Sequence, residues 1–299
     1  MHDYRNELNA LPKRHDFLIC VDSDGTVFDT MAAKHRCFRD SLIQCFGLRG
    51  REAEIAAEVW AYVNLHSIHR GKNRFRSLLL TMDLLRARGV VLPGMQHLRA
   101  WTETETQLGN PALCALLERN FSEEMDTVFQ WSRESDAKIA ATVHGVPPFP
   151  LVRETLEMFS RSADILVVSH TPCETLVREW TEHGIGQYVI YLAGQECGSK
   201  TEHIRYVSEG KYPAGRILTI GDSPGDRAAA EANHALFFPI FPGREAESWR
   251  ELSGEGKDRF FCGVFTGLYQ ENLLNRFRNV LLNVPPWETD RTDDFTQTP

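Results

Sequence analysis

The chain has 299 residues, of which 42% are hydrophobic and 25% are charged, a composition typical of a soluble globular protein. Its length is sufficient for one large domain or two ordinary ones. The formal net charge of -8 argues against general binding to nucleic acid or to an anionic membrane, and we expect neither as a partner. An anionic small substrate would need a local positive site.

Seven cysteines without a CxxC pair argue against a disulfide framework and against a zinc ribbon, and favour reduced thiols. The N-terminal stretch MHDYRNELNALPKRHDF lacks the apolar core of a secretory signal. No stretch approaches the roughly 20 apolar residues that span a bilayer. We therefore expect a cytoplasmic protein.

The first predicted strand, residues 17–22, is a continuous apolar run that ends in Asp22-Ser23-Asp24-Gly25-Thr26. Such a run is typical of a central parallel strand covered on both faces, and open α/β sheets bind ligands at the carboxyl edge of their strands. Two carboxylates so close raise each other's pKa unless a cation or a proton-transfer task separates their roles. The pair indicates a metal-assisted reaction, and its alternative is a turn-forming pair before Gly25.

From about residue 30 to 145 the apolar residues follow a helical period, and the stretch contains no convincing strand. We expect Trp60, Phe75 and Met82 to pack in the core of this helical block. Prolines at 147, 148 and 150 then mark a domain junction.

Helices and strands alternate after this junction, which predicts βαβ units and a parallel sheet. The expected strands contain DILVVSH, YVIYLA, RILTIGD and ALFFPI, and residues 17–22 should join them. The fold class is therefore α/β, a Rossmann-like parallel sheet with an inserted all-helical cap domain. We expect the core at 1–29 and 147–285, the cap at 30–146, and a flexible tail at 286–299.

Four of the strands lead to polar clusters at this predicted sheet edge. They supply, in chain order, two acids, a hydroxyl, a cation and two more acids: Asp22 and Asp24, Ser169, Lys200, Asp222 and Asp226. An aspartate can attack phosphorus, and a second carboxylate can transfer a proton to the leaving group. Carboxylate oxygens suit Mg²⁺, and a hydroxyl and a cation can bind phosphoryl oxygens. The set predicts phosphoryl transfer with an aspartate as nucleophile, Asp24 as acid and base, and Asp22 with Asp222 as Mg²⁺ ligands.

Local patterns place two of these groups near helix starts. Ser199 and Glu202 form a capping-box pattern, which places Lys200 in a first helical turn. Pro172 behind Thr171 as a cap places Ser169 just before another helix. Both loops suit an anion.

The ordered set resembles the motifs of the haloacid dehalogenase superfamily, the aspartate-nucleophile phosphatases and their relatives. Asp22-Ser23-Asp24-Gly25-Thr26 is similar to its first motif, Ser169 to its second, Lys200 to its third, and Gly221-Asp222 with Asp226 to its fourth. The resemblance implies that Asp22 is the nucleophile, that Asp226 supports the metal site and that the Asp24 carbonyl is a further ligand. It also implies that the helical insert is a C1-type cap.

Each single element has a plainer interpretation. Ser169 alone would be a strand-end cap, Lys200 a surface lysine, and Asp222 and Asp226 helix caps. In the insert, HSIHRGKNRFRS gathers basic residues that would bind a second anionic group of the substrate or form a solvated helix end. The candidate substrate-binding residues are Ser169, His170, Lys200, Arg70, Lys72 and Arg74. Histidines 66, 69 and 170 have no metal-site spacing.

The leading hypothesis is a Mg²⁺-dependent phosphatase that acts on a small phosphomonoester through an aspartyl-phosphate. The first alternative is a phosphomutase of the β-phosphoglucomutase type, which returns the phosphoryl group to the sugar. Less favoured are a phosphonate hydrolase with a Schiff-base lysine at 34 or 72, which Asp24 argues against, and a binding protein without turnover.

Overall fold

The computed structural model describes residues 3–289, and the chain forms two compact units. Unit 1 comprises Met1–Met31 and His144–Val280, and unit 2 comprises Ala32–Val143 and Leu281–Pro299. The helical block is therefore inserted between two segments of unit 1, close to the boundaries expected at 29 and 147.

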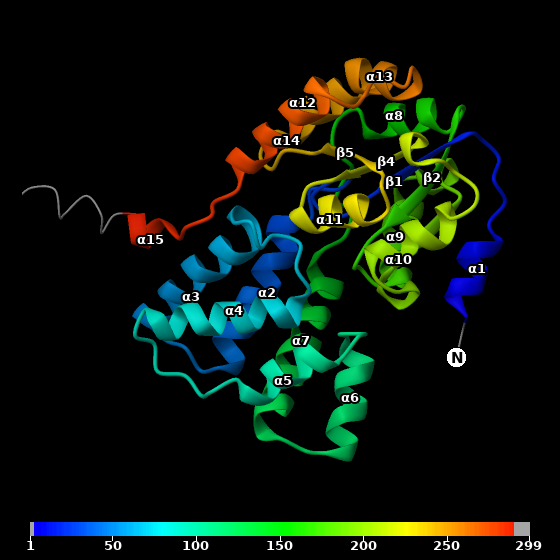
Figure 1. Cartoon of the computed structure of the whole chain (residues 1–299). Coiled ribbons are helices and arrows are strands. Elements are labelled where there is room, and N and C mark those ends of the chain that lie inside the picture. Colours follow the sequence, from blue (N-terminus) through cyan, green and yellow to red (C-terminus); the bar gives the residue numbers. More distant parts are fainter. Residues whose placement is uncertain (1–2, 290–299) are drawn as a thin grey trace, which may run out of the picture. The chain divides into compact units, whose positions relative to one another are not determined.

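Unit 1 is built on a parallel sheet of five strands in the order β3-β2-β1-β4-β5 (Figure 1). The central strand β1 (Phe17–Val21) lies between β2 and β4, although both come much later in the chain. Val21 is in register with Val167 of β2 and with Ile220 of β4. Since parallel strands in register end together, the residues that follow these three strands meet at one sheet edge. The bounds of the other strands are β2 (Ala163–Val168), β3 (Tyr191–Ala193), β4 (Ile217–Gly221) and β5 (Leu236–Pro239).

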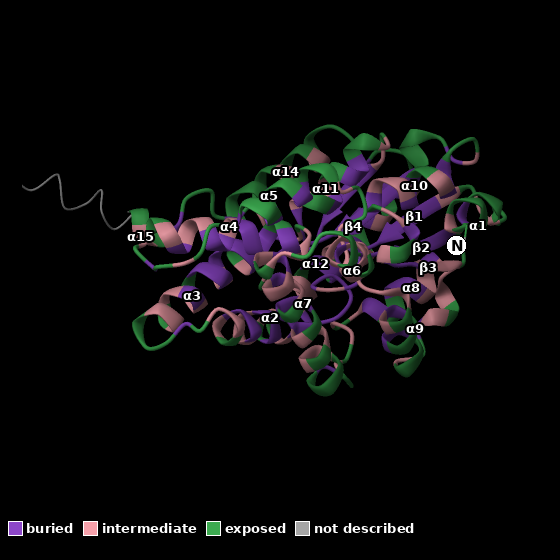
Figure 2. Cartoon of the chain, turned by 90° about the horizontal axis from the view of Figure 1, so that it is seen from below, coloured by how far each residue is buried: buried purple, intermediate pink, exposed green. Residues whose placement is uncertain are grey.

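Helices cover both faces of this sheet, which explains why its strands are apolar without alternation. On one face, Leu18 and Cys20 of β1 belong to a buried cluster with residues of α1, α10 and α11. Figure 2 shows α10 and α11 on one side of the strands and α8 and α9 on the other. The helices of unit 1 are α1 (Tyr4–Ala10), α8 (Val152–Phe159), α9 (Cys173–Glu182), α10 (Lys200–Ser208), α11 (Pro224–Ala232), α12 (Glu245–Glu251), α13 (Lys257–Phe261) and α14 (Leu268–Val280).

Unit 2 is helical and has its own aromatic core. Trp131 is fully buried, donates from Nε1 to the carbonyl of Phe38 at 3.0 Å, and contacts the rings of Trp60 and Phe75. The prediction that Trp60, Phe75 and Met82 pack in this core is confirmed. Its helices are α2 (Met31–Cys45), α3 (Arg51–Ala61), α4 (Arg74–Ala87), α5 (Gln96–Thr104), α6 (Asn110–Arg119), α7 (Glu123–Thr142) and α15 (Pro286–Thr289).

The C-terminal segment differs from expectation. Residues from Leu281 onward belong to unit 2, because the backbone of Leu282 pairs with His66 and Ile68. The expected core boundary at 285 is therefore wrong, and so is a flexible tail from 286, since Pro286–Thr289 is a helix and Trp287 packs on Tyr62. Residues 290–299 of that expected tail lie outside the described residues.

Aromatic packing should dominate the stability of unit 2, and two phenylalanines allow a matched test. Phe75 is 1% exposed and Phe121 is 68% exposed. We expect Phe75→Ala to lower the free energy of unfolding by about 3–5 kcal/mol, because it leaves a cavity in the core. Phe121→Ala should change it by less than about 0.5 kcal/mol. Urea denaturation followed by tryptophan fluorescence measures both, and equal losses would contradict this description of the core.

Candidate active site

The segment after β1 is held by a backbone hydrogen bond to the neighbouring strand and by hydrogen bonds from two tryptophans. The backbone N–H of Asp22 donates to the carbonyl of Ile220, which continues the pairing of β1 with β4 by one residue. Trp180 of α9 donates from Nε1 to Ser23 Oγ at 3.1 Å, and Trp249 of α12 donates to the carbonyl of Thr26 at 2.8 Å. Both indoles are fully buried, so they fix the position of the Asp22–Thr26 segment.

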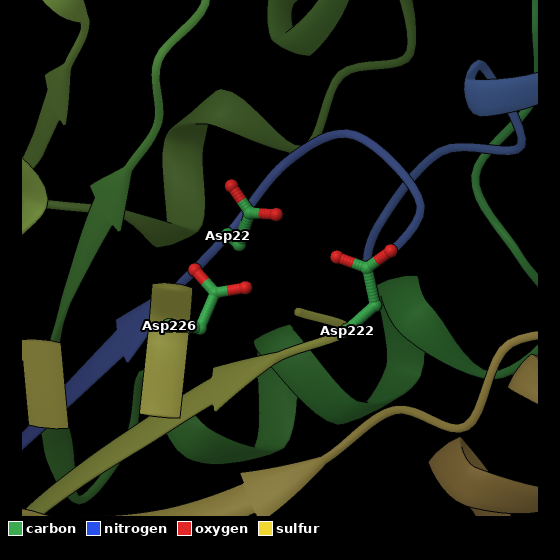
Figure 3. Close-up of side chains that lie close together, drawn as sticks. All are labelled: Asp22, Asp222 and Asp226. Atoms are coloured by element: carbon green, nitrogen blue, oxygen red, sulfur yellow. The ribbon is translucent and has the colours of Figure 1, made fainter. Parts of the chain in front are cut away.

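Three carboxylates converge at this sheet edge (Figure 3). Asp22 follows β1, Asp222 follows β4, and Asp226 lies in the first turn of α11. One oxygen from each lies within 4.8 Å of the others, and all three side chains are buried. Asp22 Oδ2 and Asp222 Oδ1 both lie within hydrogen-bonding reach of the Thr26 hydroxyl, at 3.4 and 3.3 Å. These two oxygens therefore lie on the same side of the cluster.

Lys200 supplies the positive charge of the cluster. Its Nζ lies 2.8 Å from Asp22 Oδ1 and 2.6 Å from Asp226 Oδ1, and the side chain is buried. The predicted capping box is present: Ser199 accepts from the N–H of Glu202, whose carboxylate accepts from the N–H of Ser199. This cap begins α10 at Lys200 and thereby aims its side chain at the sheet edge. Burial opposes the charge of Lys200, but the carboxylates of Asp22 and Asp226 outweigh burial and raise its pKa.

The pKa of Asp22 is raised, first by burial and then by the neighbouring Asp226 and Asp222, while Lys200 opposes the rise. Three buried carboxylates thus bring oxygens within 4.8 Å of one another, and the Lys200 ammonium contacts two of them. Carboxylate oxygens gathered in this way are the donors that a hard divalent cation such as Mg²⁺ prefers. The residues therefore fit a magnesium ion.

Asp226 is the most constrained member of the cluster. Its Oδ1 accepts from Lys200, and its Oδ2 accepts from the N–H and the hydroxyl of Ser223. It thus acts as a helix cap, as the plainer interpretation held, and also places Lys200. With three hydrogen bonds from protein donors, Asp226 fixes both Lys200 and the first turn of α11.

Asp24 is separate from this cluster and is held by two threonines. Its Oδ1 accepts from the hydroxyl of Thr30, and its Oδ2 accepts from the hydroxyl of Thr171 at 2.7 Å. The prediction that Thr171 caps a helix is wrong: α9 begins at Cys173 without a side-chain cap, and Thr171 contacts Asp24 instead. The sequence pattern did not indicate either contact. Thr171 and Asp24 in particular come together only through the pairing of β1 with β2.

Ser169 lies directly after β2 and is buried. Its backbone N–H donates to the carbonyl of Ala193, and its Oγ accepts from the N–H of Thr171 at 3.1 Å. The hydroxyl proton can therefore be donated to another acceptor. His170 is exposed, and its side chain is not fixed by burial.

The basic residues of unit 2 have partners within that unit. Arg74 pairs with Asp136 at 2.5 Å and lies over the ring of Phe38, and Arg70 is buried and donates to the carbonyl of Leu65. Lys72 lies 2.9 Å from His69 Nδ1, and its pKa is lowered by burial and by Arg76. These contacts hold Arg74 within unit 2, and the binding of a substrate anion by Arg70, Lys72 and Arg74 stays a prediction.

No protein-family model matches the chain, and no curated protein matches it. Solved structures do. A candidate phosphoglycolate phosphatase of Lactobacillus delbrueckii subsp. bulgaricus matches with a TM-score of 0.51 at 16% identity, over 80% of this chain and 92% of that one. A candidate haloacid dehalogenase-like hydrolase of Bacteroides fragilis matches with a TM-score of 0.50 at 16% identity, over 78% and 92% of the two chains.

The chain has the fold of the haloacid dehalogenase superfamily. The predicted fold class of a parallel α/β sheet is thus confirmed, and the resemblance drawn from the sequence motifs agrees with these matches at the level of the fold. Within residues 3–289, no helix has the length and apolarity to cross a bilayer. Open parallel α/β sheets bind ligands at the carboxyl edge of their strands, and the carboxylates and Lys200 gather at that edge in this chain.

The close approach of β4 to Asp226 allows a test of this geometry. A methyl group at Gly221 would overlap the carboxyl carbon of Asp226, whereas one at Gly215, just before β4, would have no atom within 4 Å. We expect Gly221→Ala to lower the free energy of unfolding by about 1–3 kcal/mol through overpacking. Gly215→Ala should change it by less than about 0.5 kcal/mol. Chemical denaturation of the two variants decides, and a tolerated Gly221→Ala would mean that Asp226 is placed differently.

Proposed function

We propose that the chain is a Mg²⁺-dependent phosphatase that hydrolyses a small phosphomonoester through an aspartyl-phosphate on Asp22. The observation that carries this proposal is the buried cluster of Asp22, Asp222 and Asp226 with the ammonium of Lys200 between two of them. Burying several charged groups together costs stability, and such clusters with shifted pKa values are typical of functional sites. A carboxylate that attacks phosphorus beside a divalent cation would use these charges directly.

Asp22 is the nucleophile in this proposal. An oxygen of its carboxylate forms a bond to phosphorus as the bond from phosphorus to the leaving oxygen breaks. Asp22 is held by β1, by Lys200 and by the Thr26 hydroxyl, so it is fixed before substrate arrives. Fixed geometry of this kind lowers the entropic cost of reaching the transition state.

Asp24 is the general acid and then the general base. It gives a proton to the leaving alkoxide in the first step and removes one from the attacking water in the second. Both of its oxygens contact threonine hydroxyls, and a hydroxyl can either donate or accept a hydrogen bond. Asp24 can thus lose and regain a proton without losing the contacts to Thr30 and Thr171 that position it.

Ser169 and Lys200 bind the oxygens of the transferring phosphoryl group in this proposal. Ser169 has a hydroxyl proton to donate, and Lys200 brings a positive charge next to the nucleophile. Bound through Asp22, Asp222 and the Asp24 carbonyl, Mg²⁺ would neutralise charge on the phosphoryl group and on the carboxylates. It would also lower the raised pKa of Asp22, which must be ionised to attack.

Phosphate release from sugar, nucleotide and organic-acid phosphates tests the proposal, with and without Mg²⁺. We expect Asp22→Asn to lower turnover by more than about 10⁴-fold, because the nucleophile is lost. Asp24→Asn should lower it by about 10²–10⁴-fold, the usual contribution of general acid–base catalysis. Asp29→Asn is the matched control: Asp29 is exposed on the same loop, and its variant should keep wild-type turnover.

Full turnover in Asp24→Asn would remove Asp24 from the mechanism. Metal-dependent rearrangement of a sugar phosphate without phosphate release would instead show the phosphomutase, which uses the same intermediate. No turnover of either kind on any phosphate would overturn the proposed function.

Metal binding has a separate test that needs no substrate. Mg²⁺ at 100 times its dissociation constant should stabilise the folded wild type by about 2.7 kcal/mol, seen as a higher melting temperature. Asp222→Asn removes one ligand and should lose most of this gain, whereas Asp29→Asn should keep it. An equal gain in wild type and Asp222→Asn would place the metal elsewhere.

A further inference from the structure

Two cysteines that are distant in the sequence, Cys173 and Cys197, have their sulfur atoms close together. Cys173 begins α9, and Cys197 ends the short helical turn η3 (Gln195–Cys197) that precedes α10. Their sulfur atoms lie 3.7 Å apart, and neither is in a disulfide. Cys173 is partly exposed, and Cys197 is buried. The sequence analysis treated all seven cysteines as reduced thiols, and the proposed mechanism uses neither of these two.

The backbone on both sides holds these sulfurs together. The N–H of Gln195 donates to the carbonyl of Thr171, and the N–H of Cys173 donates to the Glu196 carboxylate at 2.9 Å. Gly194 permits this packing, because a methyl group there would lie 2.6 Å from Thr171 O and 2.8 Å from Cys173 Sγ. The sulfur pair is thus a consequence of loop packing, and not a chance approach of two mobile side chains.

Each of the two loops carries a group of the proposed mechanism. Thr171, which holds Asp24, lies two residues before Cys173, and Lys200 lies three residues after Cys197. A bond between the two sulfurs would connect the support of the general acid to the segment that positions the ammonium group.

We propose that Cys173 and Cys197 form a reversible disulfide when the protein meets a hydroperoxide, and that this disulfide inhibits the phosphatase. The inhibition rests on the proposed function, whereas formation of the disulfide does not. The reaction needs deprotonation of the cysteine thiols only, and the proposed Mg²⁺ ligands take no part in it.

The chemistry balances with a hydroperoxide as the oxidant. The Cys197 thiolate attacks one peroxide oxygen, the O–O bond breaks, and hydroxide leaves, which gives a sulfenic acid. The Cys173 sulfur then attacks the Cys197 sulfur, the S–OH bond breaks, and water leaves with the thiol proton. Two thiols lose two electrons in total, and the peroxide gains them. The pKa of Cys197 is lowered, first by the hydrogen bond with Cys173, which favours Cys197 as the attacking group.

The two sulfurs must approach each other before they can bond. A disulfide has an S–S length of about 2.05 Å, so the sulfurs have to approach by about 1.6 Å from their separation of 3.7 Å. We expect the backbone to take up part of this movement and to pass it to Thr171, two residues before Cys173, and to Lys200, three residues after Cys197. Because a misplacement of about 1 Å in an active site can reduce turnover about 100-fold, we expect at least a tenfold loss.

The experiment treats the reduced full-length protein with one to a few equivalents of hydrogen peroxide and then divides the sample. One part is digested without reductant, and mass spectrometry searches for the peptide pair joined through Cys173 and Cys197. The other part is assayed for Mg²⁺-dependent phosphate release before and after dithiothreitol. Cys173→Ser and Cys197→Ser test the pair, and Cys262→Ser, at an exposed cysteine, is the matched control.

We expect the linked peptides in wild type and in Cys262→Ser, with at least a tenfold loss of turnover that dithiothreitol reverses. Either single variant of the pair should lack the linked peptides and keep its turnover after peroxide. Absence of the linked peptides in wild type overturns the disulfide, and linked peptides with unchanged turnover overturn the inhibition. If the reduced protein hydrolyses no phosphate, the proposed function fails, and the linked peptides alone decide on the disulfide.

Discussion

The rest of the site depends on the two ion pairs that the ammonium group of Lys200 forms with Asp22 and Asp226. Its Nζ lies 2.8 Å from Asp22 Oδ1 and 2.6 Å from Asp226 Oδ1, so these two buried carboxylates would lose a shared ion-pair partner without it. Removing one partner from a buried ion pair typically costs about 3–5 kcal/mol, because the remaining charge is left unpaired. The chain secures the position of Lys200 twice, through the Ser199 capping box and through Asp226, which is itself held by Ser223. In the proposed function, a divalent cation would add further positive charge at these carboxylates.

The parallel register of the sheet explains how such distant residues meet. β1 pairs with β2 and β4 in register, so Asp22, Ser169 and Asp222 leave the sheet at the same edge. Insertion of a complete helical unit after β1 does not disturb this register, because each unit buries its own core. The same arrangement brings the loop after β2 against the loop after β3, where Cys173 and Cys197 meet. The parallel pairing of the strands therefore determines the positions of both the proposed catalytic residues and the two cysteines of the proposed disulfide.

The fold and most of the cluster were predictable because they depend on local signals. Apolar runs that end in acids indicate strand ends, and the rule that parallel strands end together brings Asp22 and Asp222 to one place. The contacts of Asp24 with Thr30 and Thr171 were not predictable, since a lone threonine near a helix start more often caps that helix. The anchoring of the Asp22–Thr26 segment by Trp180 and Trp249 was equally hidden, because tertiary packing alone decides the partner of an indole N–H. The last residues of the core were misplaced because Leu282 pairs with the backbone of unit 2, which no local pattern indicates.

Whether Asp22 carries a covalent phosphoryl group is the most direct test of this account. Wild-type protein with Mg²⁺ and p-nitrophenyl phosphate would be quenched in acid within milliseconds and digested, and the peptide that contains Asp22 would be weighed by mass spectrometry. The account predicts a fraction of that peptide heavier by one phosphoryl group, absent when Asp22 is replaced by Asn. Rapid turnover with no phosphorylated peptide at any quench time would contradict it, because water would then attack the substrate directly.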